Sequence, residues 1–475
     1  PWRVFGQLLG ENPDHRSEDL SFPLLADISS LRFKQAVAEA VLDNPELCRE
    51  LESTMGQTLR GVRSTWHALD DLWERAEELF KEKKIDEVRR ETIQRFLVND
   101  PETLYFRDPG ALRKWLEFAR KIKSSSGAAG LGVRPGSHYV PWAYYALLRA
   151  DGDDMGRTLS GELSHLGLDI KQYLIEALEG ELKNLAIMVM EGREVAGEFA
   201  DRLRRIVERG RVPLSLSYHV SISRALMMTA LSDYEVIENP YRTSASCRGG
   251  SPSSDYGTVD KGLDGFVVYA GGDDLLALVP VDRCLSAVIR TRTRYCIGDG
   301  GTPGFHKIMN YFVPTMGPLG RSYSVYVAHY MYPMYAVLEA SHRALEGVAK
   351  EAGYSARGEG WRKDTLVITY SPRGGEEHAV LPLKMMPLAV EQRELCRGVE
   401  VTRELLGMVE KGRLSTSLFY DVQAQGELLR AAHREGGSLA RELVMRLLKR
   451  NLQRGPLPEH LAGEFDELAG GPHLS

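Results

Sequence analysis

The sequence predicts an α+β protein in which a sheet is layered with helices. Three observations lead to this class. Short apolar runs typical of buried strands alternate with segments of helical periodicity between residues 144 and 371. Turns rich in Gly and Asp separate several of these segments. Long stretches of helical pattern lie on both sides of this region, so the strands are expected to form one central domain.

The strand-containing region, residues 139–385, is expected to run in the order strand, helices, hairpin, helix, strand, helix, strand. Strands are predicted at 144–150, on both sides of Gly271-Gly272, at 322–330 and at 364–371. Helices are predicted up to about residue 209, at 213–237 after a Ser-rich entry, at 281–294 and at 334–353. The polar segment 239–262 is rich in Gly, Ser and Pro and is expected to be an exposed insertion.

The two flanks are expected to be helical domains. In the first, residues 1–138, the segment 27–120 carries Leu, Glu, Arg, Lys and Ala at helical spacing with a charged outer face. The segment 121–138, KIKSSSGAAGLGVRPGSH, is expected to form a surface loop. Residues 386–475 return to a helical pattern and predict a C-terminal helical domain whose tail, GGPHLS, is frayed.

The composition is that of an ordinary globular protein. Of the 475 residues, 43% are hydrophobic and 27% are charged, and the net charge is -6. No run of about 18 apolar residues occurs, which argues against a membrane span. The net charge gives no general attraction to nucleic acid, so such contact would need local basic patches or partner subunits.

The cysteines predict neither a zinc knuckle nor a disulfide framework, because all five are far apart and none forms a Cys-x-x-Cys pair. Free buried thiols in a reducing compartment are the favoured interpretation, and we expect a cytoplasmic protein. The five are Cys48, Cys247, Cys284, Cys296 and Cys396.

Two acidic clusters follow predicted strands. Asp151 and Asp153 come directly after YYALLRA, and Asp273 and Asp274 come after FVVYAGG. Adjacent carboxylates repel each other, so a metal ion, a lysine or water is expected to face them. If the first strand lies beside the hairpin, the two clusters meet at one edge of the sheet. An ordinary hairpin tip is the alternative, because Gly-Asp pairs are common in turns.

Clustered carboxylates at a sheet edge favour a Mg²⁺ or Mn²⁺ site, because hard cations prefer carboxylate oxygens and complete their shell with water and substrate phosphate. Two such ions can support in-line nucleotidyl transfer. Gly271 and Gly272 would allow a tight turn and a close approach of the backbone to a triphosphate.

Other polar residues could complete such a site. Lys350 and Lys363 could neutralise phosphate charge, although a lysine at a helix end is also favourable on its own. Ser217 and His219 could touch a base or ribose, although a helix N-cap or plain surface position is the alternative.

Five segments occur in the order typical of one family. They are YYALLRADGDDMGRTLSG, SLSYHVSISRAL, FVVYAGGDDLLALVP, SYSVYVAHYMYPMYAVLEASHRALEGVAK and DTLVITYSPRGGE. Together they resemble the large palm-domain subunit of type III CRISPR effector complexes, of the Cmr branch. Two further segments resemble that family. The segment that leads into the second palm is similar to FPLLADISSLRFKQAV, and the start of the C-terminal helical domain is similar to KGRLSTSLFYDV.

The resemblance implies a ferredoxin-like cyclase/polymerase palm with helical insertions, related to the GGDEF diguanylate cyclases. It implies that Asp151, Asp273 and Asp274 are catalytic and hold the metal ions, with Asp153 as a weaker metal candidate. It maps Lys350 onto a lysine that contacts the triphosphate in GGDEF-type relatives. The other expected nucleotide contacts, Ser217, His219, Gly271 and Gly272, come from the residue types and turn chemistry given above.

The resemblance also implies ATP as substrate, cyclic oligoadenylate or a related adenylyl compound as product, and activation by target RNA. The implied partners are the other subunits of the complex, guide RNA and target RNA, with no membrane.

The chain departs from the full family pattern. It contains no His-Asp dipeptide, and the family's first palm and four-cysteine zinc module are not found. It also begins without Met. We therefore expect a truncated, split or reduced subunit, for which another chain could supply the first palm.

Two other functions stay open. One is a catalytically silent scaffold subunit of the same complex, and the other is a stand-alone GGDEF-type cyclic-dinucleotide synthase.

Overall fold

The computed structural model describes the chain in segments that form two compact units. One unit contains the described residues up to Tyr145 together with His329–Met331, and the other contains Ala146–Ala328 and Tyr332–Ser475. The described residues are 25–56, 80–81, 86–98, 109–126, 143–162, 170–176, 178–212, 214–238, 265–298, 305–308, 311–317, 319–356, 359–370, 377–385, 395–435, 437–463 and 473–474.

The first unit is helical, as predicted. Its helices are α2 (Leu25–Asp43), α3 (Pro45–Gly56), α5 (Glu87–Val98) and α7 (Pro109–Ser126). Phe33, Phe96 and Trp115 pack against one another with ring centroids 5.7–6.1 Å apart. The prediction of a loop at 121–138 is wrong for residues 121–126, because α7 continues to Ser126 and buries Ile122. The rest of that loop lies outside the described residues.

The second unit contains a six-stranded sheet in the order β10-β9-β6-β1-β3-β2. The strands β6-β1-β3-β2 have the order fourth-first-third-second of a ferredoxin-like unit, with helices between the first and second and between the third and fourth. The predicted palm topology is therefore confirmed. The bounds are β1 (Tyr144–Gly152), β2 (Phe266–Gly271), β3 (Asp274–Pro280), β6 (Arg321–His329), β9 (Thr365–Tyr370) and β10 (Glu377–Pro382).

Two added strands extend this sheet beyond β6. β9 pairs parallel to β6, and β10 pairs antiparallel to β9. Parallel pairing needs a crossover, which α15 (Met334–Ala344) and the π-helical turn η4 (Leu345–Ala349) provide. The helix predicted at 334–353 thus ends early, because Gly353 begins a new strand.

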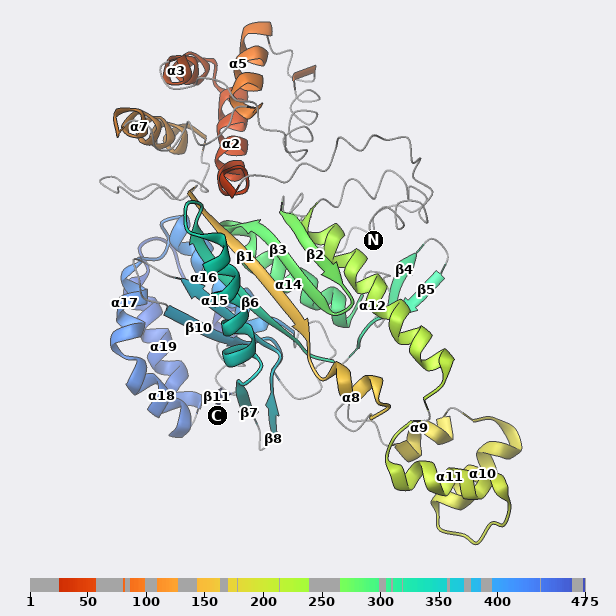
Figure 1. Cartoon of the computed structure of the whole chain (residues 1–475). Coiled ribbons are helices and arrows are strands. Elements are labelled where there is room, and N and C mark those ends of the chain that lie inside the picture. The colour runs from red at the N-terminus through yellow and green to blue at the C-terminus, as the bar shows by residue number, and fades with distance from the viewer. Residues whose placement is uncertain are drawn as a thin grey trace, which may run out of the picture. The chain divides into compact units, whose positions relative to one another are not determined.

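The two faces of the sheet are covered by different helices (Figure 1). On β9, Leu366 packs in the large core with helices α12 (Leu216–Ile237), α14 (Cys284–Cys296) and α16 (Arg397–Glu410). The next residue, Val367, packs with Leu345 and Ala349 of the crossover. Because successive strand residues point to opposite faces, α15 and η4 cover the face opposite to α14.

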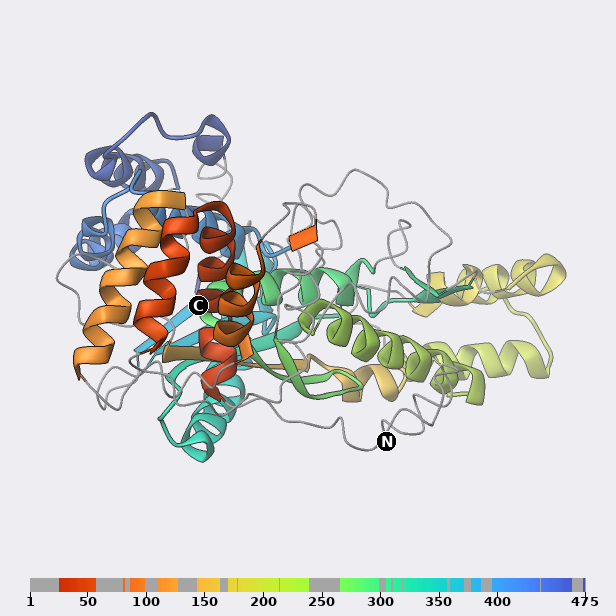
Figure 2. The ribbon, with the colours of Figure 1, turned by 90° about the horizontal axis from the view of Figure 1, so that it is seen from above.

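A small helical bundle interrupts the region between β1 and β2. It consists of α9 (Ile170–Glu176), α10 (Gly180–Met190) and α11 (Glu198–Arg209), and it has its own core around Ala186 and Leu203. Figures 1 and 2 both show it beyond α8 (Met155–Leu159) and the start of α12. The insertion predicted at 239–262 lies outside the described residues.

The C-terminal helices follow the sheet, as predicted. After α16 come α17 (Ser417–Ala424), α18 (Gly426–Glu435) and α19 (Gly437–Asn451), which bury Leu418, Leu447 and Leu448. The division into three domains at residues 138 and 385 stays a prediction. The tail is not frayed throughout, because β11 (His473–Leu474) pairs with β7.

Sequence patterns missed the short hairpins. These are β4 (Phe305–Ile308) with β5 (Tyr311–Pro314), and β7 (Gly353–Ala356) with β8 (Glu359–Arg362). Strands of four residues are too short to show a period. The four cysteines in the described segments are buried and form no disulfide with one another, which agrees with the predicted buried thiols. Among the helices described, none combines the length and apolar character needed to cross a membrane.

Candidate active site

The first acidic cluster begins at the end of β1. Ala146, Leu148 and Ala150 point into the large core, so alternation places Asp151 on the opposite face, the one covered by α15 and η4. Asp151 keeps 23% of its side chain exposed. The strand thus supplies an apolar anchor on one face and a partly exposed carboxylate on the other.

The second cluster lies in the β2–β3 hairpin, whose register pairs Gly271 with Asp274. Gly272 has a φ of 68°, a left-handed conformation that favours glycine. A Cβ added at Gly152 would lie only 2.6 Å from the Cβ of Asp273. The predicted meeting of the two clusters at one edge is therefore observed, and the glycine at position 152 permits it.

The carboxylates at this edge repel one another. The pKa of Asp273 is raised, first by burial and then by the negative charges of Asp151 and Asp274. The pKa of Asp274 is also raised, by burial and by Asp151. Arg321 opposes both shifts. Because the negative charge of Asp151 makes Asp273 and Asp274 more costly to ionise, the edge favours the approach of a cation.

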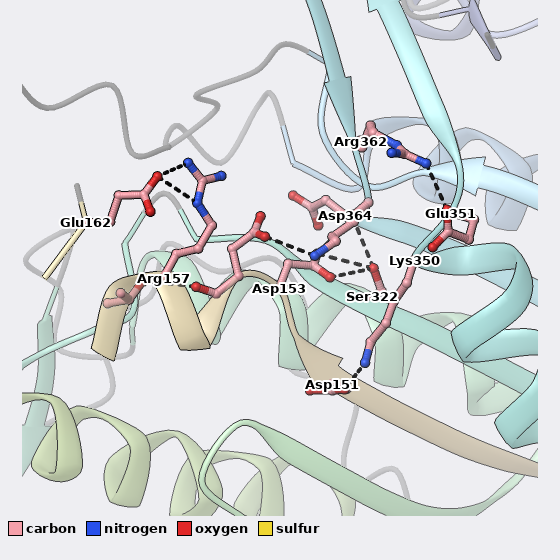
Figure 3. Close-up of polar contacts among 12 residues, drawn as sticks. Asp151, Asp153, Arg157, Glu162, Ser322, Lys350, Glu351, Arg362 and Asp364 are labelled. Atoms are coloured by element: carbon pink, nitrogen blue, oxygen red, sulfur yellow. Dashed lines mark hydrogen bonds and ion pairs between the residues drawn. The ribbon is translucent and has the colours of Figure 1, made fainter. Parts of the chain in front are cut away.

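A lysine faces the first carboxylate. The ammonium of Lys350 donates a hydrogen bond to Asp151 (Figure 3). It also donates one to Glu346, at 2.7 Å. Burial alone would lower the pKa of Lys350, but these carboxylates raise it above its ordinary value. The π turn sets the position of this lysine, because the Lys350 N–H donates to the carbonyl of Leu345 at 3.0 Å, five residues earlier.

Asp153 has other partners. Its side chain is 3% exposed and accepts hydrogen bonds from Ser322 Oγ at 2.9 Å and from the Asp364 N–H at 2.9 Å (Figure 3). Burial, together with the Asp364 charge, raises its pKa to about 7. Its carboxylate is thus engaged inside the protein, and its role as a metal ligand stays a prediction. Lys363, the other candidate cation, contacts Asp154 at 2.9 Å.

Two buried ion pairs behind this edge were not predicted. Arg321 pairs with Asp233 at 2.7 Å, and Arg292 pairs with Asp364 at 2.8 Å; none of the four side chains is more than 1% exposed. A signal was present in the sequence. Asp233 and Arg292 recur at helical spacing with buried apolar residues of α12 and α14, where a charged residue needs a buried partner.

The two remaining predicted nucleotide contacts lie at the start of α12. Ser217 and His219 are exposed, and the described contacts do not connect them with the carboxylates. The N-cap is Ser215, whose side chain accepts a hydrogen bond from the Tyr218 N–H at 3.1 Å. The structure therefore brings together Asp151, Lys350 and the Gly271–Asp274 turn, while the roles of Ser217 and His219 stay predictions.

The donor set at the edge suits a divalent cation in its chemistry, because it offers carboxylate oxygens and an excess of negative charge. In the part of the chain that the structure describes, however, no group of three or more His, Cys, Asp or Glu residues is close enough to hold a metal ion. Asp151 is already paired with Lys350. Metal binding would require the carboxylates to move toward one another and Lys350 to withdraw.

Comparisons with known proteins agree with the palm topology. Residues 144–357 match the model of the second palm domain of Cas10/Cmr2. The CRISPR system CMR subunit Cmr2 of Saccharolobus solfataricus is 25% identical over 562 aligned residues, which include all of this chain and 48% of that protein. The Cmr2 of Pyrococcus furiosus is 26% identical over 51% of this chain and 20% of its own length. The chain thus spans at most about half the length of these curated relatives.

Solved structures give the same fold. A chain of the type III-B Cmr-beta complex in its apo state superposes with a TM-score of 0.66 at 23% identity, covering 96% of this chain and 44% of that one. The complex bound to cognate target RNA gives the same score and covers 45% of its chain. The predicted resemblance is confirmed: residues 144–357 are similar to the second palm domain of Cas10/Cmr2, and the chain as a whole resembles Cmr2.

Proposed function

We propose that this chain is the nucleotidyl-transferring palm subunit of a type III CRISPR complex, and that it joins ATP molecules into cyclic oligoadenylate or a related adenylyl product. The observation that carries the proposal is the edge beside Lys350, where burial and the charge of Asp151 raise the pKa of Asp273 and Asp274. Clustered carboxylates that repel each other have no structural use at a sheet edge, but they suit cation-assisted phosphate chemistry.

In this proposal the 3′-hydroxyl oxygen of one ATP attacks the α-phosphorus of another. The new P–O bond forms as the bond from the α-phosphorus to the bridging oxygen breaks, pyrophosphate leaves, and the hydroxyl proton passes to water. Bound Mg²⁺ or Mn²⁺ would neutralise phosphate charge and lower the pKa of the attacking hydroxyl. No protein nucleophile is needed, because positioning and charge supply the catalysis.

The chain's own residues have separate roles in this reaction. Asp151, Asp273 and Asp274 would hold the cations, which would neutralise phosphate charge. The turn lets the phosphates approach the backbone at Gly272, since a Cβ there would meet nothing within 4 Å, whereas the Tyr269 side chain lies against Gly271. Lys350 leaves Asp151 and pairs with the triphosphate as a point charge.

The partners follow from the relatives. The solved neighbours belong to the type III-B Cmr-beta complex, in one case bound to cognate target RNA. We infer the same kind of assembly for this chain, with other Cmr subunits, guide RNA and target RNA as partners, in the cytoplasm.

The test measures product formation from ATP and Mn²⁺ by the chain, alone and with its partner subunits and target RNA. Chromatography and mass spectrometry detect the linked adenylates and the released pyrophosphate. We expect the Asp273→Ala/Asp274→Ala variant to form no product while keeping its fold. Asp282→Ala, in the partly exposed turn after β3, is the matched control and should behave as the unmodified chain. Equal product from the double variant would refute the assignment.

A catalytically silent scaffold subunit is the second candidate. The Lys350–Asp151 ion pair favours it, because it neutralises one of the carboxylates on which cation binding depends. In that case the chain and its assembled complex would bind no non-hydrolysable ATP analogue in the presence of Mn²⁺. A preference for GTP over ATP would instead indicate a cyclic-dinucleotide synthase of the GGDEF type.

A further inference from the structure

Arg321 connects the acidic turn with the interior of the second unit. It is the first residue of β6 and its side chain is 0% exposed. Two guanidinium nitrogens donate to the carboxylate oxygens of Asp233 on α12, at 3.1 and 2.7 Å. The third, Nε, donates to the main-chain carbonyl of Asp273 at 3.2 Å. One buried side chain therefore joins a helix to the carbonyl of a proposed catalytic residue.

Stability alone does not explain a buried ion pair at this place. Removing two charges from water is costly, and well-packed apolar residues of similar volume are often as stable or more so. Apolar residues, however, cannot donate a hydrogen bond to the carbonyl of Asp273. The directional contact to the turn is the part of this arrangement that only the guanidinium can provide.

The guanidinium of Arg321 also packs against an aromatic ring. Its central carbon lies 5.1 Å from the ring centroid of Tyr295 on α14, within cation–π range. The hydroxyl of Tyr295 in turn lies 2.8 Å from the point that a Cβ at Gly152 would occupy. Arg321, Tyr295 and the end of β1 are thus packed together directly behind Asp273.

We propose that Arg321 is a positioning residue for the acidic turn: by holding the carbonyl of Asp273, it keeps the carboxylates of Asp273 and Asp274 beside Asp151. The consequence for cation binding depends on the function proposed above. The restraint on the turn does not depend on it and can be measured separately.

The experiment separates this role from simple stability. Arg321→Met with Asp233→Leu replaces the ion pair by apolar residues and removes the hydrogen bond to Asp273. The matched control is Arg294→Met with Glu235→Leu, which removes another ion pair between α14 and α12, of 3.2 Å, whose described contacts do not reach the turn. Arg321→Lys is a second test variant, because it keeps a buried cation near Asp233 but lacks the fork that reaches both partners.

Three quantities are measured on the full chain. They are the midpoint of thermal unfolding, the hydrogen-exchange rate of the peptide covering residues 265–280, and the Kd for Mn²⁺ alone from electron paramagnetic resonance. We expect the double variant to unfold near the temperature of the unmodified chain. Its turn peptide should exchange about fivefold faster or more, and Mn²⁺ should bind about tenfold more weakly. The control should change neither the exchange nor the Kd.

The exchange rate of the turn peptide decides whether Arg321 positions the turn. Unchanged exchange of the turn peptide in a folded test variant would overturn the proposal, because a structural pair replaced by apolar residues would leave the turn unaffected. If the double variant does not fold, the exchange of Arg321→Lys gives the decision. If hydrogen exchange of the turn peptide rises in the test variant but the unmodified chain binds no Mn²⁺, the role of Arg321 in restraining the turn is supported. The proposed cation site is then refuted.

Discussion

The acidic edge and the buried ion pairs behind it use the same kinds of side chain in opposite ways. At the edge, Asp151, Asp273 and Asp274 are gathered with Lys350 as the ion-pair partner of Asp151, and burial and repulsion raise the pKa of the other two. In the interior, each guanidinium is matched to one carboxylate, with no side chain of either pair more than 1% exposed.

This difference shows where the molecule tolerates unbalanced charge. A buried charge without a partner is too costly to keep, so the interior pairs are complete and serve to fix the backbone. The carboxylates gathered at the edge are partly exposed instead, so water or a cation can meet their excess negative charge. The comparison predicts large effects on folding from the interior pairs and smaller, ligand-dependent effects from the edge.

The largest effect is expected from Arg292→Met. The variant leaves the Asp364 carboxylate fully buried, with Lys384, 3.7 Å away, as its remaining ion-pair partner in the part of the chain that the structure describes. Burial would raise the pKa of Asp364, and Arg292 is the main reason that it stays below its ordinary value. Losing one partner of such a pair should lower the free energy of unfolding by about 3–5 kcal/mol, measured by urea denaturation.

Arg343→Met is the control for the same substitution on the surface. Arg343 pairs with Glu339 along α15, and their side chains are 59% and 66% exposed. Its free energy of unfolding should stay within about 0.5 kcal/mol of the unmodified chain. If Arg292→Met lowers the free energy of unfolding by less than about 1 kcal/mol, the Arg292–Asp364 pair contributes little to the stability of the fold.

The same comparison explains how much could be predicted from the sequence. The strands around Asp151, Asp273 and Asp274 were predictable because apolar runs end directly at each cluster, and alternation on β1 then fixes the face that carries Asp151. The pairing of β1 with β3 brings the clusters together, as the resemblance implied.

The interior partners could not be predicted in the same way. Asp233 and Arg321 are separated by 88 residues, and nothing local to either residue specifies the other. The engagement of Asp153 by the main chain at Asp364 likewise depends on how β1 and β9 are arranged across the sheet. The position of Lys350 depends on a π turn, a one-residue irregularity that helical periodicity does not reveal.

The next effect concerns pH. Asp153 lies between Ser322, the Asp364 carboxylate and main-chain N–H, and the Lys363 ammonium, and its pKa is raised to about 7 from an ordinary 3.8. Between these values the folded chain binds a proton that the unfolded chain does not, so stability falls as pH rises. The loss should be about 1 kcal/mol per pH unit, ending above pH 7.

Asp153→Asn mimics the protonated carboxyl and should remove this part of the pH dependence. Urea denaturation at pH 5, 6, 7 and 8 measures it, with Asp282→Asn in the partly exposed turn after β3 as the control. If the free energy of unfolding changes with pH equally in the unmodified chain and in Asp153→Asn, Asp153 does not carry a proton in the folded chain over this range.

A smaller effect is expected where the two acidic clusters touch. In Gly152→Ala the new Cβ would lie 2.6 Å from the Cβ of Asp273 and 2.8 Å from the Tyr295 hydroxyl. Such overpacking should cost about 1–3 kcal/mol and displace the turn. Gly156→Ala, with nothing within 4 Å of its new Cβ, should be neutral or slightly stabilising. Equal unfolding free energies for the two variants would show that the clusters do not touch as described.

The smallest effect tests the edge itself. In Lys350→Met the ammonium that pairs with Asp151 is removed, so Mn²⁺ no longer competes with it for that carboxylate. Because a partly exposed ion pair is worth little, Mn²⁺ alone should bind only about threefold to tenfold more tightly, while a non-hydrolysable ATP analogue should bind more weakly. Lys363→Met removes a comparable lysine, which pairs with Asp154, and should change neither affinity. Weaker binding of Mn²⁺ alone in Lys350→Met would mean that the lysine supports the cation site rather than competing for it. The excess negative charge of the carboxylates at the edge would then not explain how the cation is attracted.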